Sequence, residues 1–304
     1  MYSQQIVRAN NKVWRIEEAD SFGDVLSHIE NTKRIWHHDG GSEDKSHSYS
    51  DNMPWHGTEN FKQAMDLAKY GWSEGRNQLK DGLDVANVLR KSKAHKSEGL
   101  DVAGAYPLVP AAVAGDPMCM FTVGQDVIKT KPVVRIIVNS FVSAGISHKV
   151  IMNRGAAILS WVDALEAMSV RCEIYVSCIG GANNSSGLGP DYVSLGCYAK
   201  RAEEVVDLDR LAFVLVHPAF FRRIQFAVME RAPDMGRRYN HYCMPCDLIP
   251  PTMDIPHSVY FTCAGLNNAD YQSPATAVAA VERAIMKSLQ QSEVEDDLKS
   301  MEDW

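Results

Sequence analysis

The stretch that decides the fold is Pro-Val-Val-Arg-Ile-Ile-Val-Asn at residues 132–139, a run rich in β-branched residues that is typical of a strand buried on both faces. A short polar loop, Ser-Phe-Val-Ser-Ala-Gly-Ile-Ser, follows at residues 140–147. The helical period then appears in residues that recur every three or four positions: Ile151, Gly155, Ile158, Val162 and Leu165. Residues 171–178 again have a strand-like composition. The order strand, loop, helix, strand predicts a βαβ unit with parallel strands.

Further strand and helix signals continue this pattern as far as residue 290. Residues 192–198 alternate as an edge strand would, and the apolar run Leu211–Val216 predicts another buried strand. A helix is expected to begin at His217-Pro218, because proline is tolerated at the first helical position. Residues 258–263 and 275–289 predict the last strand and the last helix. We therefore expect an α/β domain with a doubly wound, mostly parallel sheet over residues 131–290.

The N-terminal part is expected to be mostly helical and to pack on that domain. Residues 1–56 predict a loosely ordered arm, with a short strand at 13–16 and a short helix at 21–29. Residues 57–130 predict a helical stripe with Thr58 as its N-cap, followed by an extended, buried connector at 102–117 that is rich in proline. Residues 291–304 form an acidic tail, which we expect to be solvated.

Composition narrows the class of protein. The 304 residues include 45% apolar and 23% charged side chains, which is typical of a globular protein with a sizeable core. The net charge of −7 argues against a general nucleic-acid coat, because backbone binding needs a surplus of lysine and arginine. The seven cysteines are scattered, and the sequence has neither a signal-peptide pattern nor an apolar run of membrane-spanning length. We therefore expect a cytoplasmic protein with reduced thiols.

The loop after residues 132–139 carries a resemblance to a known family. The order of elements and the stretch Asn139-Ser140-Phe141-Val142-Ser143 resemble a von Willebrand factor A domain, in which this loop reads Asp-x-Ser-x-Ser and holds a divalent metal. Here Asn139 replaces the aspartate and Phe141 the first serine, and only Ser143 fits. A hard cation prefers anionic oxygen ligands, so the resemblance implies this fold with a degenerate metal motif.

Four sequence blocks also resemble uncharacterised proteins of tailed bacteriophages: residues 55–58, 71–75, 153–157 and 217–223. This resemblance spans nearly the whole chain and implies a phage-encoded protein, located in the host cytoplasm or in the virion. Among von Willebrand A-like proteins of bacteria and phages, a common role is that of adaptor for a hexameric AAA+ ATPase. The resemblance implies the same role for this chain.

Candidate binding residues follow from the rule that ligands of open α/β sheets bind beyond the carboxyl ends of the strands. We expect a partner-binding rim of hydrogen-bonding side chains: Asn139, Ser140, Ser143, His217, Asn267 and Asn268. Ser143 and His217 could meet there as a nucleophile and its base, but neither a carboxylate pair nor a Gly-x-Ser-x-Gly elbow accompanies them. The rim therefore favours partner binding over catalysis.

A possible metal centre lies in the long loop between the predicted helix after Pro218 and the last strand. His241, Cys243, Cys246 and His257 are residue types that bind structural zinc, and one Cys-x-x-Cys supplies half of a tetrahedral site. Their spacing matches no strong zinc signature. Cysteine is also a common buried residue, and that is the alternative interpretation.

Two arginine pairs form the second charged candidate. Arg222-Arg223 and Arg237-Arg238 bracket the end of one predicted helix, and together with His241, Tyr239 and Tyr242 they are a possible anion or nucleic-acid patch. The favoured interpretation is that these arginines form salt bridges with Glu230 and Asp234.

Taken together, these signals favour a non-catalytic protein-interaction module over an enzyme, with an AAA+ ATPase or virion proteins as its partners. No cofactor is expected apart from the structural zinc considered above. One competing hypothesis is a virion structural component. The other is a nucleic-acid-associated protein that uses the arginine cluster, and its binding would weaken steeply with salt.

Overall fold

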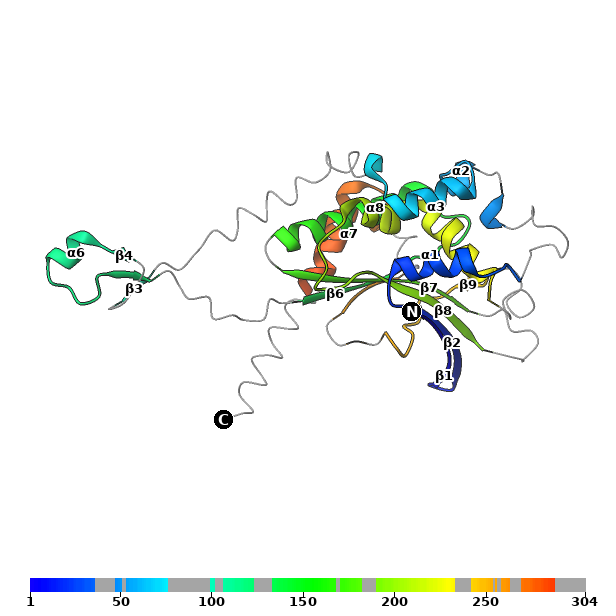
Figure 1. Ribbon diagram of the computed structural model, residues 1–304, viewed down its shortest axis with the longest axis horizontal. Helices are drawn as coiled ribbons and strands as arrows, with labels where there is room; N and C mark the ends of the chain where they lie inside the picture. The colour runs from blue at the N-terminus through cyan, green and yellow to red at the C-terminus, as the bar shows by residue number, and fades with distance from the viewer. Residues whose placement is uncertain are drawn as a thin grey trace.

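The computed structural model describes residues 1–35, 47–50, 53–75, 99–101, 106–122, 133–167, 170–181, 190–232, 242–253, 255, 258–262 and 269–287. Its central element is a seven-stranded mixed sheet in the order β1-β2-β8-β7-β6-β10, with β9 paired to β7 (Figure 1). The strands are β1 (Tyr2–Ala9), β2 (Lys12–Ala19), β6 (Val133–Asn139), β7 (Arg171–Gly181), β8 (Tyr192–Lys200), β9 (Met244–Pro245) and β10 (Val259–Phe261). With the helices that cover it, this sheet confirms the predicted α/β class.

The βαβ unit predicted from residues 132–178 is present. β6 leads through α7 (His148–Ala167) to β7, and these two strands run parallel, with Val133 opposite Arg171. β6 also pairs in parallel with β10, and β2 with β8, whereas β7 and β8 are antiparallel. β6 therefore lies inside the sheet, as its β-branched sequence predicts.

Four of the described helices pack on one face of the sheet, called the covered face here. α1 (Phe22–Asn31), α3 (Phe61–Tyr70), α7 and α8 (Leu208–Val216) lie on the same side (Figure 1). Their apolar side chains join every second residue of β6, β7 and β8 in one large core cluster. The residues in between face the other side, the open face, where smaller clusters surround Ile16 and Ile137. A doubly wound sheet has helices on both faces, so the described residues do not meet that part of the prediction.

The segment up to Asn31 belongs to the sheet and its helical cover, which corrects the prediction of a loosely ordered arm. β1 and β2 form an antiparallel hairpin, and β2 pairs with β8 from Trp14 onward. The short strand and helix expected at 13–16 and 21–29 are present as parts of β2 and α1. The sequence does not predict the full length of β2, because the charged residues Arg15 and Glu17 look like surface residues. In the structure they form a buried ion pair on the covered face (Nε–Oε1 2.6 Å).

The apolar run Leu211–Val216 is part of helix α8, so the prediction of a strand there is wrong. Asp207 caps the helix, and its carboxylate accepts a hydrogen bond from the Arg210 amide (3.0 Å). Every residue of the run is buried, and a run buried on all sides has no periodicity that distinguishes a strand from a helix. β8 is not an edge strand either, because it lies between β2 and β7.

The other predicted helices are present with shifted bounds. The one expected after His217-Pro218 consists of the π-helix η3 (Phe220–Gln225) and α9 (Phe226–Met229). α3 is capped by Asn60 and not by Thr58, and a helix over residues 274–287 corresponds to the one predicted at 275–289. Among the helices of the described part, none by itself has the length and apolar content to cross a membrane.

A small second sheet forms from residues within the expected connector and on either side of it. β3 (Gly99–Asp101) and β4 (Tyr106–Pro107) both pair antiparallel with β5 (Met120–Thr122), and α6 (Val109–Val113) lies between β4 and β5 in sequence. Val109 and Val113 are 62% and 82% exposed, so the prediction of a buried, extended connector is wrong here. The acidic tail at 291–304 lies outside the described residues.

Candidate functional site

The predicted rim begins at Asn139, whose side chain serves the structure. Its Oδ1 accepts hydrogen bonds from the amides of Phe141 (3.1 Å) and Ile179 (3.3 Å), and its Nδ2 donates to the Cys246 carbonyl (2.8 Å). An ionised aspartate could not make the last bond, because it only accepts. Asn139 therefore holds the end of β6 against the loop of Cys246.

The other rim residues do not gather around Asn139 as ligands. The Ser140 hydroxyl is buried and bonded to the Ser177 carbonyl (2.8 Å) and Gln225 Oε1 (2.6 Å). Ser143 is exposed after the end of β6. Asn267 and Asn268 lie outside the described residues.

His217 lies on the covered face, directly after α8, and not at the end of a strand. Its ring packs between Trp72 and Phe213, and its Nδ1 accepts a hydrogen bond from the Ala219 amide (3.1 Å). Burial lowers the pKa of His217 to about 4, so the ring is neutral at physiological pH. Within the described residues, no hydrogen bond joins His217 to Ser143.

An apolar pocket of about 290 Å³ occupies the position expected for the rim. Ser143 and Ala144 form one side of it, and the remaining lining is largely aromatic or apolar: Trp55, Phe141, Val142, Phe226, Tyr242, Cys243, Met244 and Pro245. The location at the end of β6 agrees with the prediction, but the chemistry of the lining does not. Hydrogen-bonding side chains were expected, and apolar ones dominate.

The Arg222-Arg223 pair is buried, so its prediction as an anion or nucleic-acid patch is wrong. Both side chains lie inside the molecule, with exposures of 1% and 0%. The Arg222 guanidinium also lies 4.5 Å from the centre of the Trp55 ring. Arg222 donates hydrogen bonds to the carbonyl oxygens of Trp55 (2.6 Å) and Ile146 (2.9 Å). Arg223 donates to the Thr58 hydroxyl (2.6 Å) and to the carbonyl oxygens of Ser48 (2.8 Å) and Thr58 (2.9 Å). The pair thus holds Ser48, Trp55, Thr58 and Ile146, which are distant in sequence, against the covered face.

Glu230 completes this buried arrangement, although not as the predicted partner of the arginine pair. Its carboxylate accepts hydrogen bonds from the hydroxyls of Ser48 (2.6 Å) and Tyr242 (2.6 Å), and the Arg34 guanidinium lies 4.0 Å away. We call η3, α9 and Glu230 the clamp segment, because their charged side chains fix loops of the N-terminal region. Asp234, Arg237 and Arg238 lie outside the described residues.

The zinc site remains a prediction. His241 and His257 lie outside the described residues, and burial raises the pKa of the Cys243 and Cys246 thiols, which disfavours the thiolate form that binds zinc. Within the described ranges, no three histidine, cysteine, aspartate or glutamate side chains are grouped as a metal site requires. Metal analysis of the purified chain tests the prediction directly.

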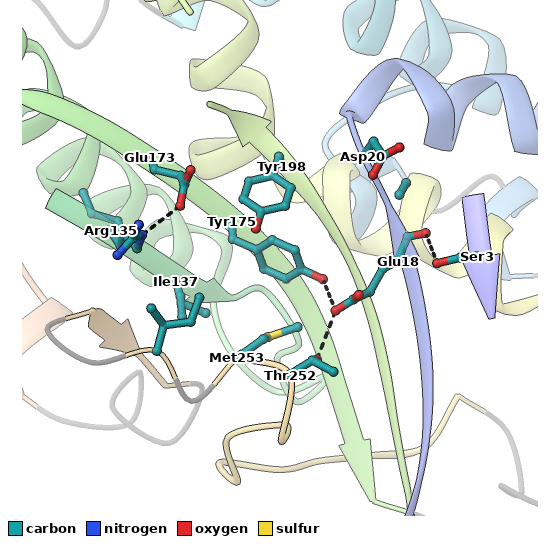
Figure 2. A pocket seen from close by; sticks show the side chains of 13 residues that line it. Ser3, Glu18, Asp20, Arg135, Ile137, Glu173, Tyr175, Tyr198, Thr252 and Met253 are labelled. Carbon is teal, nitrogen blue, oxygen red and sulfur yellow. Dashed lines mark hydrogen bonds and ion pairs between the residues drawn. The ribbon is translucent and has the colours of Figure 1, made fainter. Parts of the chain in front are cut away.

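A cavity of about 140 Å³ on the open face was not predicted from the sequence. Figure 2 shows its lining, which comes from β1, β2, β6, β7, β8 and the segment around residue 252. Most of the lining side chains considered below are aromatic or charged, together with one threonine and one methionine: Glu18, Asp20, Arg135, Glu173, Tyr175, Tyr198, Thr252 and Met253.

The cavity is organised by the ring of Tyr175, which crosses over the neighbouring strand. Tyr175 lies in β7, and its hydroxyl donates to Glu18 Oε1 in β2 (3.3 Å), with β8 between them. The crossing is possible because Gly196 of β8 has no side chain: a Cβ there would lie 2.1 Å from the Tyr175 hydroxyl oxygen. Thr252 donates to the same Glu18 oxygen (3.0 Å). Glu18 is therefore oriented from two sides (Figure 2).

The tyrosines of the cavity are protonated hydrogen-bond donors. Burial, reinforced by the Glu18 charge, raises the pKa of Tyr175 well above its usual value. Burial and Glu173 raise the pKa of Tyr198, whose ring packs edge-to-face against Tyr175 at 5.0 Å between centres. On the covered face, burial raises the pKa of the Cys172 and Cys197 thiols to about 12, so neither is a reactive thiolate. These groups can recognise a charged or aromatic ligand, but they are not activated nucleophiles.

One sequence feature, Gly196, points to this cavity. Gly196 interrupts the alternating pattern of residues 192–198, and a glycine inside a strand often marks the close approach of another group. Tyr175 and Tyr198 are ordinary strand residues by composition. Glu18 was assigned to the N-terminal arm, so its proximity to β7 could not be foreseen without the strand order.

Comparison with known proteins assigns the chain to a family. A family model described as a domain of unknown function, DUF7192, matches residues 6–288. No curated protein and no solved structure matches the chain. The matched range includes the second half of β1 and reaches the end of the helix at 274–287, so it contains the clamp segment and all of the cavity lining except Ser3. Because the match covers far more than half of its length, the chain belongs to the DUF7192 family.

Proposed function

We propose that this chain is a non-catalytic protein-interaction module and that the open face of its sheet is the partner-binding surface. The observation that carries this proposal is the asymmetry of the sheet. One face is buried under helices in a single large core cluster. The other has no described helix on it and is hollowed by a cavity with tyrosine walls. Tyrosine is enriched at protein interfaces, because it offers a large apolar surface and a polar end.

The states of the candidate catalytic side chains also support a binding role. His217 is buried beside Trp72 and Phe213, and within the described residues no hydrogen bond joins it to the exposed Ser143. A hydrolytic serine needs a base within hydrogen-bonding reach. The geometry of Ser143 and His217 in the described residues is therefore not that of a nucleophile and its base.

Within this proposal, the partner class rests on the resemblance to von Willebrand A-like and phage proteins. A phage-encoded adaptor for an AAA+ ATPase, acting in the host cytoplasm, is the first candidate, and a virion structural component is the second. A nucleic-acid role is not favoured, because Arg222 and Arg223 are occupied by backbone carbonyls inside the molecule.

Site-specific photocrosslinking tests which face binds the partner. Benzoylphenylalanine replaces exposed Gln5 in one variant and exposed Lys62 on α3 in a matched control, each expressed in the cell that supplies the natural partners. Gln5 lies opposite Ile16 on the open face and does not line the cavity, so the cavity itself is left intact. We expect a discrete crosslinked protein from position 5 and none from position 62. Equal crosslinking from both positions, or crosslinking from position 62 alone, would contradict the proposal.

The same experiment separates the candidate partners. Mass spectrometry of the crosslinked band identifies either an ATPase or a capsid or tail protein. Loss of the band on nuclease treatment, together with a steep dependence on salt, would instead favour the nucleic-acid hypothesis and count against the protein-interaction module.

A further inference from the structure

We propose that the open-face cavity accepts the cationic end of a lysine or arginine side chain from the partner protein, with Glu18 as its counter-ion. This inference rests on the proposed function, because it specifies the chemistry by which the open face recognises its partner. It depends on the charge balance around the cavity, on the aromatic walls and on the size of the space.

The charge balance singles out Glu18. Glu173 is paired with Arg135 (Nε–Oε1 3.1 Å), and the Arg201 guanidinium lies 3.8 Å from Asp20. Glu18 has no cationic partner among the described residues. Its Oε1 accepts the two hydroxyl hydrogen bonds from Tyr175 and Thr252, whereas its Oε2 accepts none from the described part of the chain. Three carboxylates thus line the cavity, and Glu18 is the one that has no cationic partner among the described residues.

The walls suit a cation better than an anion. A cation near an aromatic ring is attracted by the negative charge on the ring face, and this attraction grows when water is excluded. The chain already uses the interaction here, because the Arg201 guanidinium lies 3.6 Å from the centre of the Tyr198 ring. An anion at Glu18 would meet like charge, and an apolar group would leave the half-buried carboxylate without compensation.

The size of the space fits the end of one long side chain. The cavity of about 140 Å³ is far larger than the about 10–15 Å³ that a single water needs. Ile137 and Met253 form an apolar floor, which can contact the methylene stem of a lysine or arginine while its charged group reaches Glu18. Figure 2 shows the Glu18 carboxylate pointing toward Thr252 and Tyr175, within this lining.

Titration with small ligands tests the inference on the intact chain. Nα-acetyl-arginine amide and Nα-acetyl-lysine amide are titrated while backbone amide NMR shifts are followed. The corresponding citrulline and norleucine amides serve as neutral controls of similar shape. We expect saturable shifts at β2, β7 and β8 with a dissociation constant on the order of 1 mM for at least one cationic ligand, and at least tenfold weaker binding for the neutral ones.

The matched variants are Glu18→Gln and Glu203→Gln. Glu203 is exposed and does not line the cavity, so its substitution removes the same charge outside the site. We expect Glu18→Gln to weaken binding of the cationic amide at least tenfold and Glu203→Gln to leave it unchanged, with both variants folded by circular dichroism. Equal binding of citrulline amide, or an equal effect of the two substitutions, would overturn the inference.

Combining Glu18→Gln with the photocrosslinker at position 5 keeps this inference separate from the proposed function. If the partner still crosslinks at full yield in the Glu18→Gln background, the open face is the interface but the cationic contact is wrong. If the yield falls with Glu18→Gln and not with Glu203→Gln, both proposals are supported. If position 5 gives no partner crosslink even with Glu18 intact, the proposed function fails, whatever the small ligands do.

Discussion

The two faces of the central sheet use charged residues in opposite ways. On the covered face, the arginines and the glutamate of the clamp segment are buried, and their hydrogen-bond partners are Ser48, Trp55, Thr58, Ile146 and Tyr242. On the open face, the charged residues surround a cavity, and Glu18 has no cationic partner among the described residues. A buried charged side chain destabilises the fold unless it is paired and hydrogen-bonded, whereas a charged side chain near solvent can remain unpaired in the absence of a ligand. The comparison therefore separates charges that hold the fold from a charge available for binding.

The largest expected effect comes from removing a clamp charge. Arg223→Ala leaves the Ser48 and Thr58 carbonyls without their buried donor, so we expect the free energy of unfolding to fall by about 3–5 kcal/mol. Urea denaturation measures the change. Arg283→Ala is the control, because that exposed arginine pairs with Asp270 on the surface and should contribute only about 0–1 kcal/mol. Equal losses in the two variants would contradict the clamp.

The second effect concerns pH and His217. Because the pKa of buried His217 is lowered to about 4, the unfolded chain binds a proton at this residue below about pH 6.5 while the folded chain does not. Its contribution to stability is therefore complete above about pH 6.5 and is lost as the pH falls toward 4, by about 3 kcal/mol in all. His217→Asn keeps an acceptor for the Ala219 amide and removes the titration. Urea unfolding between pH 7 and 4 should show a shallower decline for this variant than for the natural chain, and identical slopes would contradict the prediction.

A third test probes how tightly the covered face is packed. A Cβ on Gly155 of α7 would lie 2.0 Å from the Leu215 carbonyl oxygen of α8, so the backbones of these helices touch at this glycine. We expect Gly155→Ala to destabilise the protein by about 1–3 kcal/mol, although alanine is the better helix former. Gly145→Ala is the matched control, because no atom lies within 4 Å of its added Cβ. A thermal shift in the stabilising direction for Gly155→Ala would show that the contact is absent.

The smallest effect on stability is expected on the open face. Gly196→Ala displaces the Tyr175 ring and breaks its hydrogen bond to Glu18, at a cost of about 1–2 kcal/mol. Tyr175→Phe removes the hydroxyl alone and should cost about 1 kcal/mol. Binding of the arginine amide should be lost more completely in Gly196→Ala than in Tyr175→Phe, because only the first moves the aromatic wall. NMR titration of both variants measures this, and the reverse order would contradict the described geometry.

Local patterns predicted the βαβ unit well, because β6, α7 and β7 each have a clear period and are neighbours in sequence. The failures have physical reasons as well. Leu211–Val216 is buried on all sides, so its sequence could not distinguish a helix from a strand. Arg222 and Arg223 have the composition of a surface patch, and their burial depends on carbonyl groups more than 70 residues away. The open-face cavity depends on the strand order, which no local pattern encodes.

The parallel pairing of β2 with β8 has a consequence for the timing of assembly in the cell. The hydrogen bond from the Val13 amide to Asp191 spans 178 residues, so the N-terminal hairpin cannot dock until most of the chain has left the ribosome. At about 5–20 residues per second, that delay is roughly 10–40 s. Glu18 lies on β2, and its hydrogen-bond partners Tyr175 and Thr252 lie far along the chain. A nascent chain can therefore complete the open-face cavity only after it has been synthesised as far as Thr252. A partner that binds this cavity would therefore bind fully synthesised chains and not nascent ones.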